Sequence, residues 1–429
     1  MAEFLLYGGV LDLSSLLIEG GKRIDGEFAV QGAKNAVLPI LAATVLNGGK
    51  NVVYNCPDLS DVASTVEVLE NLGCSVSRHG NILYVDSSAM NSYTIPELLM
   101  RKMRSSIIFL GAIIARCKNA CVSMPGGCEI GGRPIDLHLK ALKSLGIEIT
   151  ESHGYINCTA DKITGADIHL DFPSVGATEN IMLAACMAEG ITTIENAARE
   201  PEIVDLQNFL NRMGAKISGG GGNVIRIEGV KKLYGVEHTI IPDRIAAGTY
   251  LVCAAATNGQ LVLNNTDCSH MGAILNLLSD MGCRVFREKN RIALISNGRT
   301  QAAASVKTMP YPGFPTDIQS PFMALASISD GTSIFVENIF ENRFQHVDEL
   351  VRMGADIRID GRCAVVVGVN KLTGANVVAK DLRGGAALVA AALAADGRTT
   401  IENVRFIDRG YEHIEKYLAM CGADIIRKE

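Results

Sequence analysis

Four glycines surround a cysteine in residues 125–134, which read PGGCEIGGRP. Glycine lets a loop change conformation and approach a ligand closely, so we expect a mobile loop here. Cys128 lies on no apolar face, and Arg133 with Pro134 leads into a helical pattern, with Pro134 expected at the first helical position. A thiol near a guanidinium suggests reactive chemistry on an anionic substrate. An inert surface thiol is the alternative that this segment alone leaves open.

Seven cations stand at or near the expected starts of apolar helices. They are Lys34, Arg104, Arg133, Arg244, Arg343, Arg383 and Arg409. A helix N-terminus carries partial positive charge and usually attracts Asp or Glu, so this pattern opposes the helix dipole. Any one of these residues could be a solvated boundary residue. The set as a whole indicates a site where helix ends and cations gather around a strongly anionic ligand.

Two other expected helix starts differ in kind. Ser174, Val175 and Gly176 offer backbone N–H groups and a hydroxyl, which suit a diphosphate. Asp317, in the sequence FPTDIQ, supplies a carboxylate. It is either a helix cap or a general base that faces the cations, and the sequence leaves both open.

A short phrase with glycine as its third residue recurs six times, at intervals of 68 to 73 residues. Each copy follows an amphipathic helical pattern and precedes a strand pattern, which predicts a glycine with positive φ after each helix. The six glycines are Gly73, Gly146, Gly214, Gly282, Gly354 and Gly422. A β-branched strand ending in Asn precedes most of the copies. The repeated unit is therefore helix, strand, helix, strand, turn, strand.

Six such units divide naturally into three and three. We therefore expect an α/β protein with two similar domains, each with helices inside and sheets outside. The predicted first domain is 34–241. The predicted second domain joins 1–33 to 242–429, and the active site lies between the two domains.

Composition narrows the function classes. A chain of 429 residues with 48% apolar residues exceeds one hydrophobic core. The net charge of −6 and the lack of basic runs argue against nucleic acid. Cysteine and histidine spacings give no metal pattern, so no metal and no cofactor are expected. The cysteines lie mostly in apolar runs, as in a cytoplasmic protein with reduced thiols. We find no signal peptide or membrane-spanning run, and we expect a soluble monomer.

With these residues assembled, the chain from about Ile18 onward resembles the UDP-N-acetylglucosamine 1-carboxyvinyltransferase family of enolpyruvyl transferases. The resemblance rests on the segments 32–35 (GAKN), 102–106 (KMRSS), 125–133, 195–202 (ENAAREPE), 314–317 (FPTD), 341–344 (ENRF), 381–383 (DLR) and 408–411 (DRGY). The sister enolpyruvyl transferases of the shikimate pathway lack the loop cysteine. The family fold has two inside-out α/β domains of three units each, in agreement with the repeat count.

The resemblance implies transfer of the enolpyruvyl group of phosphoenolpyruvate to the 3-hydroxyl of UDP-N-acetylglucosamine, with release of phosphate by addition and elimination. This would be the first committed step of peptidoglycan synthesis. It implies Cys128 as the acid, as the thiol that can add to the enolpyruvyl carbon and as the target of fosfomycin. It implies Asp317 as the base, with Lys34 and Arg409 completing the catalytic set.

The resemblance also implies the binding residues. The expected phosphoenolpyruvate ligands are Lys34, Asn35, Arg133, Arg343, Arg383 and Arg409. The expected UDP-N-acetylglucosamine contacts are Asn35, Arg104, Arg133, Pro134, Ile135, Asp136, Leu137, Ser174, Val175, Gly176, Asp317 and Ile339. Ser60 and Phe172 stand where relatives often carry basic residues, which affects nucleotide contacts and not the chemistry.

Three alternatives remain at this stage. The acceptor could be another alcohol, such as shikimate 3-phosphate, which substrate competition would reveal. The chain could be a silent regulatory paralogue that binds UDP-N-acetylglucosamine, although such a copy would be free to lose Cys128 or Asp317. A purely structural repeat protein is the third alternative, and the cations at helix starts argue against it.

Overall fold

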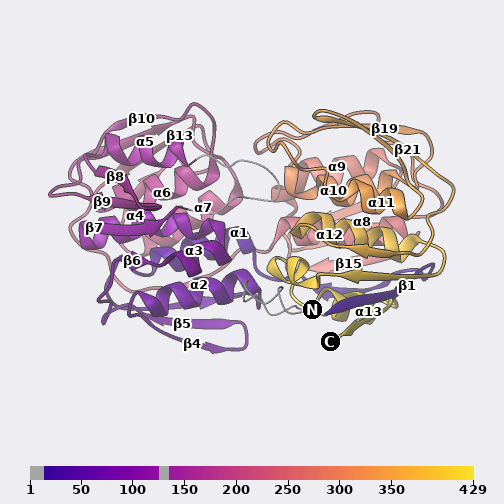
Figure 1. Ribbon diagram of the computed structural model, residues 1–429, viewed down its shortest axis with the longest axis horizontal. Coiled ribbons are helices and arrows are strands. Elements are labelled where there is room, and N and C mark those ends of the chain that lie inside the picture. The colour runs from indigo at the N-terminus through magenta and orange to yellow at the C-terminus, as the bar shows by residue number, and fades with distance from the viewer. Residues whose placement is uncertain (1–13, 125–134) are drawn as a thin grey trace, which may run out of the picture.

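The chain folds into two lobes of similar construction, shown side by side in Figure 1. The computed structural model describes residues 14–124 and 135–429. The first lobe has a hydrophobic core built from residues between Ala33 and Ile240. The second lobe has a separate core, built from residues between Leu16 and Val30 and between Ile245 and Ile425.

Each lobe carries three four-stranded sheets on its outside. In the first lobe the strand orders are β14-β3-β5-β4, β6-β7-β9-β8 and β10-β11-β13-β12. In each sheet the first pair is parallel and the other pairs are antiparallel. The strands are β3 (Lys50–Tyr54), β4 (Ser75–His79), β5 (Ile82–Asp86), β6 (Thr94–Ile95), β7 (Asn119–Ser123), β8 (Glu148–Ser152), β9 (Tyr155–Thr159), β10 (Asp167–His169), β11 (Ile191–Glu195), β12 (Lys216–Ser218), β13 (Val224–Glu228) and β14 (Glu237–Thr239).

The second lobe repeats this pattern in the orders β2-β15-β17-β16, β18-β19-β21-β20 and β22-β23-β1-β24. The last sheet joins the first described strand, β1, to the last, β24. The strands are β1 (Ser15–Glu19), β2 (Asp25–Ala29), β15 (Gln260–Asn264), β16 (Arg284–Glu288), β17 (Arg291–Ile295), β18 (Val306–Lys307), β19 (Thr332–Val336), β20 (Asp356–Asp360), β21 (Cys363–Val367), β22 (Asn376–Val378), β23 (Arg398–Glu402) and β24 (Asp424–Lys428).

Helices fill the interior of each lobe (Figure 1). The six inner helices are apolar nearly all round, and they are buried along most or all of their length, as that composition requires. They are α1 (Lys34–Ala43), α4 (Phe109–Cys117) and α6 (Val175–Ala185) in the first lobe, and α8 (Arg244–Ala256), α10 (Thr316–Ala326) and α12 (Leu382–Ala394) in the second.

Six amphipathic helices bury one face each, and every one of them ends just before a predicted cap glycine. They are α2 (Ser60–Asn71), α5 (Asp136–Ser144), α7 (Pro201–Arg212), α9 (Gly272–Asp280), α11 (Val347–Arg352) and α13 (Ile414–Met420). The six glycines all have φ between +82° and +103°, which confirms the prediction. Shorter elements are α3 (Glu97–Lys102) and the 3₁₀ helices η1 (Arg104–Ile108), η2 (Cys268–Met271) and η3 (Val404–Arg409). The predicted α/β fold of six units, with helices inside and sheets outside, is confirmed.

The chain crosses between the lobes twice, and the two crossovers lie side by side. Ala33 donates its N–H to the Ile241 carbonyl at 2.8 Å, and Asp243 donates its N–H to the Gln31 carbonyl at 3.0 Å. Gly32 has no room for a side chain, because a Cβ there would lie 1.9 Å from the Asn55 carbonyl oxygen. Each crossover leads directly into an inner helix, α1 or α8.

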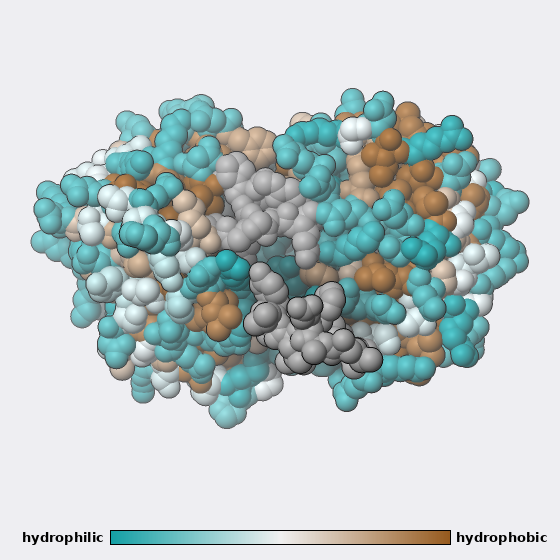
Figure 2. All heavy atoms as spheres, viewed as in Figure 1, coloured by the Kyte–Doolittle hydropathy of each residue, from teal (hydrophilic) through white to brown (hydrophobic). Residues whose placement is uncertain are grey.

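Hydrophilic side chains cover much of the face shown in Figure 2, and apolar side chains form separate patches on it. None of the helices in the described part of the chain has the length and apolar character needed to cross a bilayer. The eleven described cysteines form no disulfide with one another. Cys186, Cys253 and Cys283 are buried, as predicted from their apolar surroundings, and burial raises the pKa of Cys186 and Cys253 to about 12.

Candidate functional site

The crossovers bring the N-termini of α1 and α8 together. Lys34, the first residue of α1, donates its backbone N–H to Asp243 Oδ2 at 3.1 Å. Asp243 is also the N-cap of α8, where its Oδ1 accepts from the N–H groups of Ile245 and Ala246, both at 2.9 Å. One carboxylate therefore binds both helix starts. The two leading cations, Lys34 and Arg244, are placed where the lobes meet.

A buried carboxylate holds Lys34 and Arg409 together. Lys34 Nζ lies 2.7 Å from Asp61 Oδ2, and Arg409 Nε lies 2.9 Å from Asp61 Oδ1. Lys34 and Asp61 belong to the first lobe and Arg409 to the second, so this cluster bridges the lobes. Two cations share one carboxylate here, which leaves a net positive charge for an anionic ligand.

Burial and mutual contact shift the pKa values of this pair. Burial lowers the pKa of Lys34, and Arg409 and Arg383 act in the same direction, while Asp61 opposes them. Burial alone would raise the pKa of Asp61, but Lys34 and Arg409 bring it below its usual value. Asp61 is therefore a firmly ionised anchor for the two cations.

Asp317 is the centre of a second cluster. The two clusters are linked by Asn35, which follows Lys34 in the sequence and contacts Asp317. Arg343 Nη2 donates to Asp317 Oδ1 at 3.0 Å, and Arg383 Nη2 donates to Asp317 Oδ2 at 3.3 Å. Asn35 Nδ2, from the first lobe, donates to the same Oδ2 at 3.4 Å. Asp317 is the second residue of α10, and the N-cap is Pro315. The capping alternative is therefore wrong, and the carboxylate faces the cations.

Buried groups fix the two arginines of this cluster. Arg383 Nη1 donates to the Tyr411 hydroxyl at 3.1 Å, and that hydroxyl lies 2.9 Å from Thr249 Oγ1. Arg343 Nη1 lies 3.8 Å from Asp381 Oδ1, and Asp381 caps α12 through the N–H groups of its next residues. The side chains of Arg343 and Arg383 are only 2% and 3% exposed, so their guanidinium groups are held in place.

Two glutamates and an arginine form a further contact between the lobes, and a third glutamate is buried near them. Arg244 Nε donates to Glu202 Oε1 at 3.0 Å, from the second lobe to the first. Glu200 lies beside them and accepts from the Tyr311 N–H at 3.5 Å. Glu179 on α6 is buried, and burial together with Glu202 and Glu200 raises its pKa well above the usual value. This site therefore stabilises the protonated form of Glu179 relative to the ionised form.

The predicted nucleotide segments at the starts of α5 and α6 lie side by side. A Cβ on Gly176 would be 3.0 Å from His138 Cε1, and His138 Nδ1 lies 2.7 Å from Asn180 Nδ2. Ser174 is the N-cap of α6, and its Oγ accepts from the Ala177 N–H at 3.3 Å. This arrangement brings the set Ile135, Asp136, Leu137, Ser174, Val175 and Gly176 into one region of the first lobe.

Some sequence-based expectations are corrected or lie outside the described residues. Helix α5 begins at Asp136 and not at Pro134. Arg409 ends η3, and Arg343 precedes α11 by four residues, so neither begins a helix. Cys128, Arg133 and Pro134 lie outside the described residues. Arg104 begins η1, and Ile339 donates its N–H to Glu337 Oε1 at 2.7 Å.

The sequence interpretation gave no role to the residues that hold the cations or brace the backbone beside them. These are Asp61, Asp243, Asp381, Tyr411, Glu200, Glu202 and Glu337. Asp61 stands in the first turn of α2, where an acidic residue is the ordinary partner of the helix dipole. Glu200 and Glu202 belong to the motif ENAAREPE, Asp381 to DLR and Tyr411 to DRGY, but these motifs alone assign them no role. The partners lie tens to hundreds of positions apart, for example 28 for Arg383 and Tyr411 and 348 for Asp61 and Arg409, and no local signal marks such contacts.

Comparison with known proteins agrees with this geometry. The chain matches the EPSP synthase (3-phosphoshikimate 1-carboxyvinyltransferase) family over residues 18–418. UDP-N-acetylglucosamine 1-carboxyvinyltransferase 2 of Caldanaerobacter subterraneus subsp. tengcongensis is 57% identical, over 96% of this chain and 98% of that protein. UDP-N-acetylglucosamine 1-carboxyvinyltransferase 1 of the same organism is 49% identical, over 97% of this chain and all of that protein (100%).

A solved structure shows the same fold over the whole chain. The enolpyruvyl transferase NikO from Streptomyces tendae superimposes with a TM-score of 0.88 and 25% sequence identity, over 97% of this chain and 99% of that one. The resemblance inferred from the motifs is therefore confirmed. The chain belongs to the EPSP synthase family of enolpyruvyl transferases and, within that family, to the UDP-N-acetylglucosamine 1-carboxyvinyltransferases.

Proposed function

We propose that this enzyme transfers the enolpyruvyl group of phosphoenolpyruvate to the 3-hydroxyl of UDP-N-acetylglucosamine and releases phosphate. The observation that carries the proposal is the convergence of four cations from both lobes on two carboxylates, Asp61 and Asp317. Phosphoenolpyruvate carries a phosphate and a carboxylate, and the two cation clusters match these two anionic groups in kind and number.

The cations divide between the two anionic groups of the substrate. Lys34 and Arg409 bind the phosphate, together with Arg133. Arg343 and Arg383 bind the carboxylate, since paired guanidinium groups suit planar bidentate recognition. In the structure both of these guanidinium groups are paired with Asp317. An arriving carboxylate competes with Asp317 for them, which releases the Asp317 carboxylate to accept a proton.

The reaction then proceeds in two balanced steps. In the addition, Asp317 accepts the proton of the sugar 3-hydroxyl, whose oxygen bonds to C2 of phosphoenolpyruvate, while the Cys128 thiol gives a proton to the methylene carbon. In the elimination, the thiolate takes a proton back from the methyl group, the double bond re-forms and the C–O bond to phosphate breaks. The hydroxyl proton held by Asp317 leaves with the phosphate. General acid–base catalysis of this kind contributes about 10²–10⁴-fold to a rate.

The remaining residues hold the acceptor. Asn35 contacts the sugar, the start of α6 at Ser174, Val175 and Gly176 faces the diphosphate, and the start of α5 lies against the nucleotide with Arg104. Ile339 contributes a backbone contact. We propose the division into domains at 34–241 and at 1–33 with 242–429, so that each domain contains one hydrophobic core. We also propose the cytoplasm as the compartment, because unpaired cysteines in this number suit a reducing environment.

The acceptor is tested by competition. The enzyme is incubated with phosphoenolpyruvate and equal amounts of UDP-N-acetylglucosamine and shikimate 3-phosphate, and mass spectrometry identifies the acceptor that gains an enolpyruvyl group. We expect only the nucleotide sugar to gain it. Transfer to shikimate 3-phosphate would contradict the proposal, and so would no transfer by folded enzyme that binds UDP-N-acetylglucosamine.

A further inference from the structure

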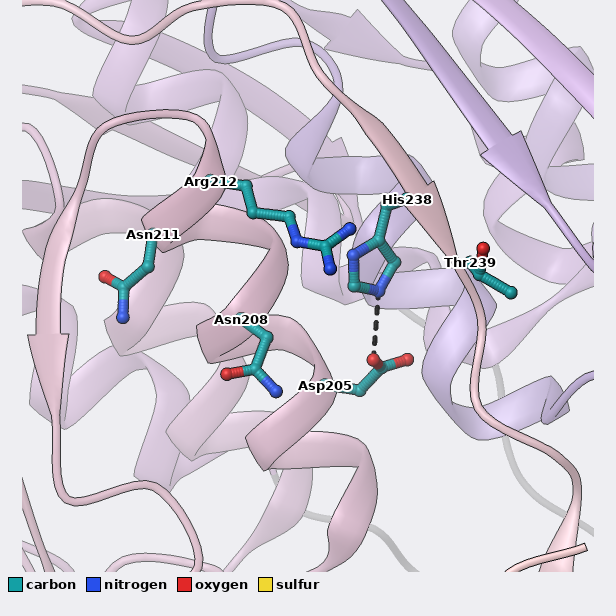
Figure 3. Close-up of a pocket in the computed structure, with 6 residues that line it drawn as sticks. All are labelled: Asp205, Asn208, Asn211, Arg212, His238 and Thr239. Atoms are coloured by element: carbon teal, nitrogen blue, oxygen red, sulfur yellow. Dashed lines mark hydrogen bonds and ion pairs between the residues drawn. The ribbon is translucent and has the colours of Figure 1, made fainter. Parts of the chain in front are cut away.

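A polar pocket lies away from the cation clusters, on the first lobe between α7 and β14. It has a volume of about 490 Å³ and is lined by Asp205, Asn208, Asn211, Arg212, His238 and Thr239 (Figure 3). Nothing in the proposed reaction uses these side chains. The pocket is lined by polar groups throughout, which argues against an apolar ligand.

A buried imidazole and a buried carboxylate form the floor of this pocket. His238 Nε2 lies 2.9 Å from Asp205 Oδ1, and both side chains are 4% exposed. Asp205 Oδ2 accepts the N–H of Ile241 at 3.3 Å, so each oxygen of this carboxylate already has a donor. Because Asp205 accepts from Nε2, the Nε2 atom carries a proton. His238 Nδ1 is buried and has no hydrogen-bond partner among the described residues.

The wall beside this nitrogen supplies positive charge. Arg212 extends from α7 toward the His238 ring in Figure 3. One of its nitrogens donates to the Glu237 carbonyl at 3.3 Å, and a guanidinium has five N–H groups in all. Asn208 adds an exposed carboxamide. Asn211 serves as a fixed wall, because its amide makes two hydrogen bonds of 2.8 Å with the Ile217 backbone.

These groups select the chemistry of a ligand. A metal cation is disfavoured, because Asp205 is already committed to two donors and Arg212 is positive. An oxyanion fits, since it can accept from the guanidinium, with the Asn208 amide at its side and the His238 ring facing it. We propose that this pocket binds a small oxyanion, a phosphate or carboxylate group, between Arg212 and His238.

The pocket is also joined to the crossover. The Ile241 N–H bonds to Asp205, and the Ile241 carbonyl accepts the N–H of Ala33, the residue before Lys34. Ile241 therefore links the floor of the pocket to the paired crossover segments through hydrogen bonds. This contact fixes Asp205, and through it the orientation of the His238 ring.

Histidine-selective NMR of the whole enzyme tests the proposal. The His238 ring signal is assigned by its loss in His238→Gln, or by its contact with the Phe209 ring, 5.4 Å away, should that variant not fold. Inorganic phosphate and acetate are titrated separately at constant ionic strength. We expect a saturable shift of the His238 signal, with binding at least tenfold weaker in Arg212→Gln. The matched control Arg226→Gln removes an exposed arginine from β13 and should bind like wild type.

Titrations with the two anions distinguish the two classes of ligand. If only phosphate gives a saturable shift of the His238 signal, the ligand is a phosphoryl group. If acetate also gives a saturable shift, with an affinity equal to that of phosphate, the ligand is a carboxylate. A shift that never saturates would overturn the proposal. So would a curve that is unchanged in Arg212→Gln, because that result would report anion binding at the cation clusters and not in this pocket.

Discussion

Lys34 Nζ and Asp61 Oδ2 lie 2.7 Å apart in a pair whose side chains are only 11% and 3% exposed. A buried charge is stable only when it is paired, and here a second cation, Arg409, shares the same carboxylate. Asp61 therefore sets the positions of two cations on opposite sides of the boundary between the lobes.

Asp61→Asn should lower kcat/KM for phosphoenolpyruvate by about 10- to 100-fold, because a hydrogen bond to a charged group contributes about 1.5–3 kcal/mol. Steady-state kinetics measures the effect. Asp396→Asn is the matched control, since it breaks a 2.6 Å pair with Lys371 whose side chains are more than half exposed. Equal losses in both variants would contradict the role assigned to Asp61.

Asp317→Asn should lower kcat by about 10²–10⁴-fold, because it removes the proposed base while keeping the size of the side chain. Calorimetric binding of UDP-N-acetylglucosamine should change much less than kcat. This difference separates loss of a proton acceptor from loss of a binding contact. A variant that keeps more than a tenth of wild-type kcat would assign the base elsewhere.

Tyr411→Phe should raise KM for phosphoenolpyruvate by about tenfold and change kcat little, because Arg383 loses the hydroxyl that orients it. Tyr411 is a positioning residue, so the split between KM and kcat is the informative measurement. Tyr250→Phe is the control. Its ring lies 6.5 Å from that of Tyr411, and its hydroxyl is buried without a hydrogen-bond partner among the described residues. If both variants behave alike, the contact with Arg383 has no kinetic role.

Glu179→Gln should stabilise the protein at pH 8 and have little effect near pH 4.5. Burial, with Glu202 and Glu200, raises the folded-state pKa of Glu179 above 4.5, so the folded state binds the proton more tightly than the unfolded state. The stability that this proton contributes is complete below about pH 4.5 and is lost as the pH rises through the folded-state pKa.

Urea denaturation at the two pH values measures this effect. The exposed Glu148→Gln should change the free energy of unfolding by less than about 0.5 kcal/mol at either pH. A Glu179→Gln variant that is equally destabilised at both pH values would show that Glu179 is ionised in the folded protein.

Short sequence patterns predicted the fold well, because each repeated unit is defined by a cap glycine and by apolar runs within a few tens of residues. The six cap glycines have the positive φ that ends each amphipathic helix. The apolar runs became buried helices such as α8 and α12. The first residue of a helix was predicted less accurately. Pro134 suggested a start two residues before the observed one at Asp136.

The candidate site was predicted only in part, because its partners are distant in sequence. The cations were visible as residues that oppose the helix dipole, and Asp317 stood among them. Asp61 gave no such signal, since an acid in a first helical turn is ordinary. Its contact with Arg409 spans 348 positions, and only the fold brings the two together.

The most direct test of the account is phosphate release from phosphoenolpyruvate, with and without UDP-N-acetylglucosamine, by wild type and Cys128→Ser. Serine keeps the size of the side chain but is a far weaker acid than the thiol. We predict that release requires the nucleotide sugar and falls at least 100-fold in Cys128→Ser. Release without the sugar, or undiminished release by the variant, would contradict enolpyruvyl transfer with Cys128 as the acid.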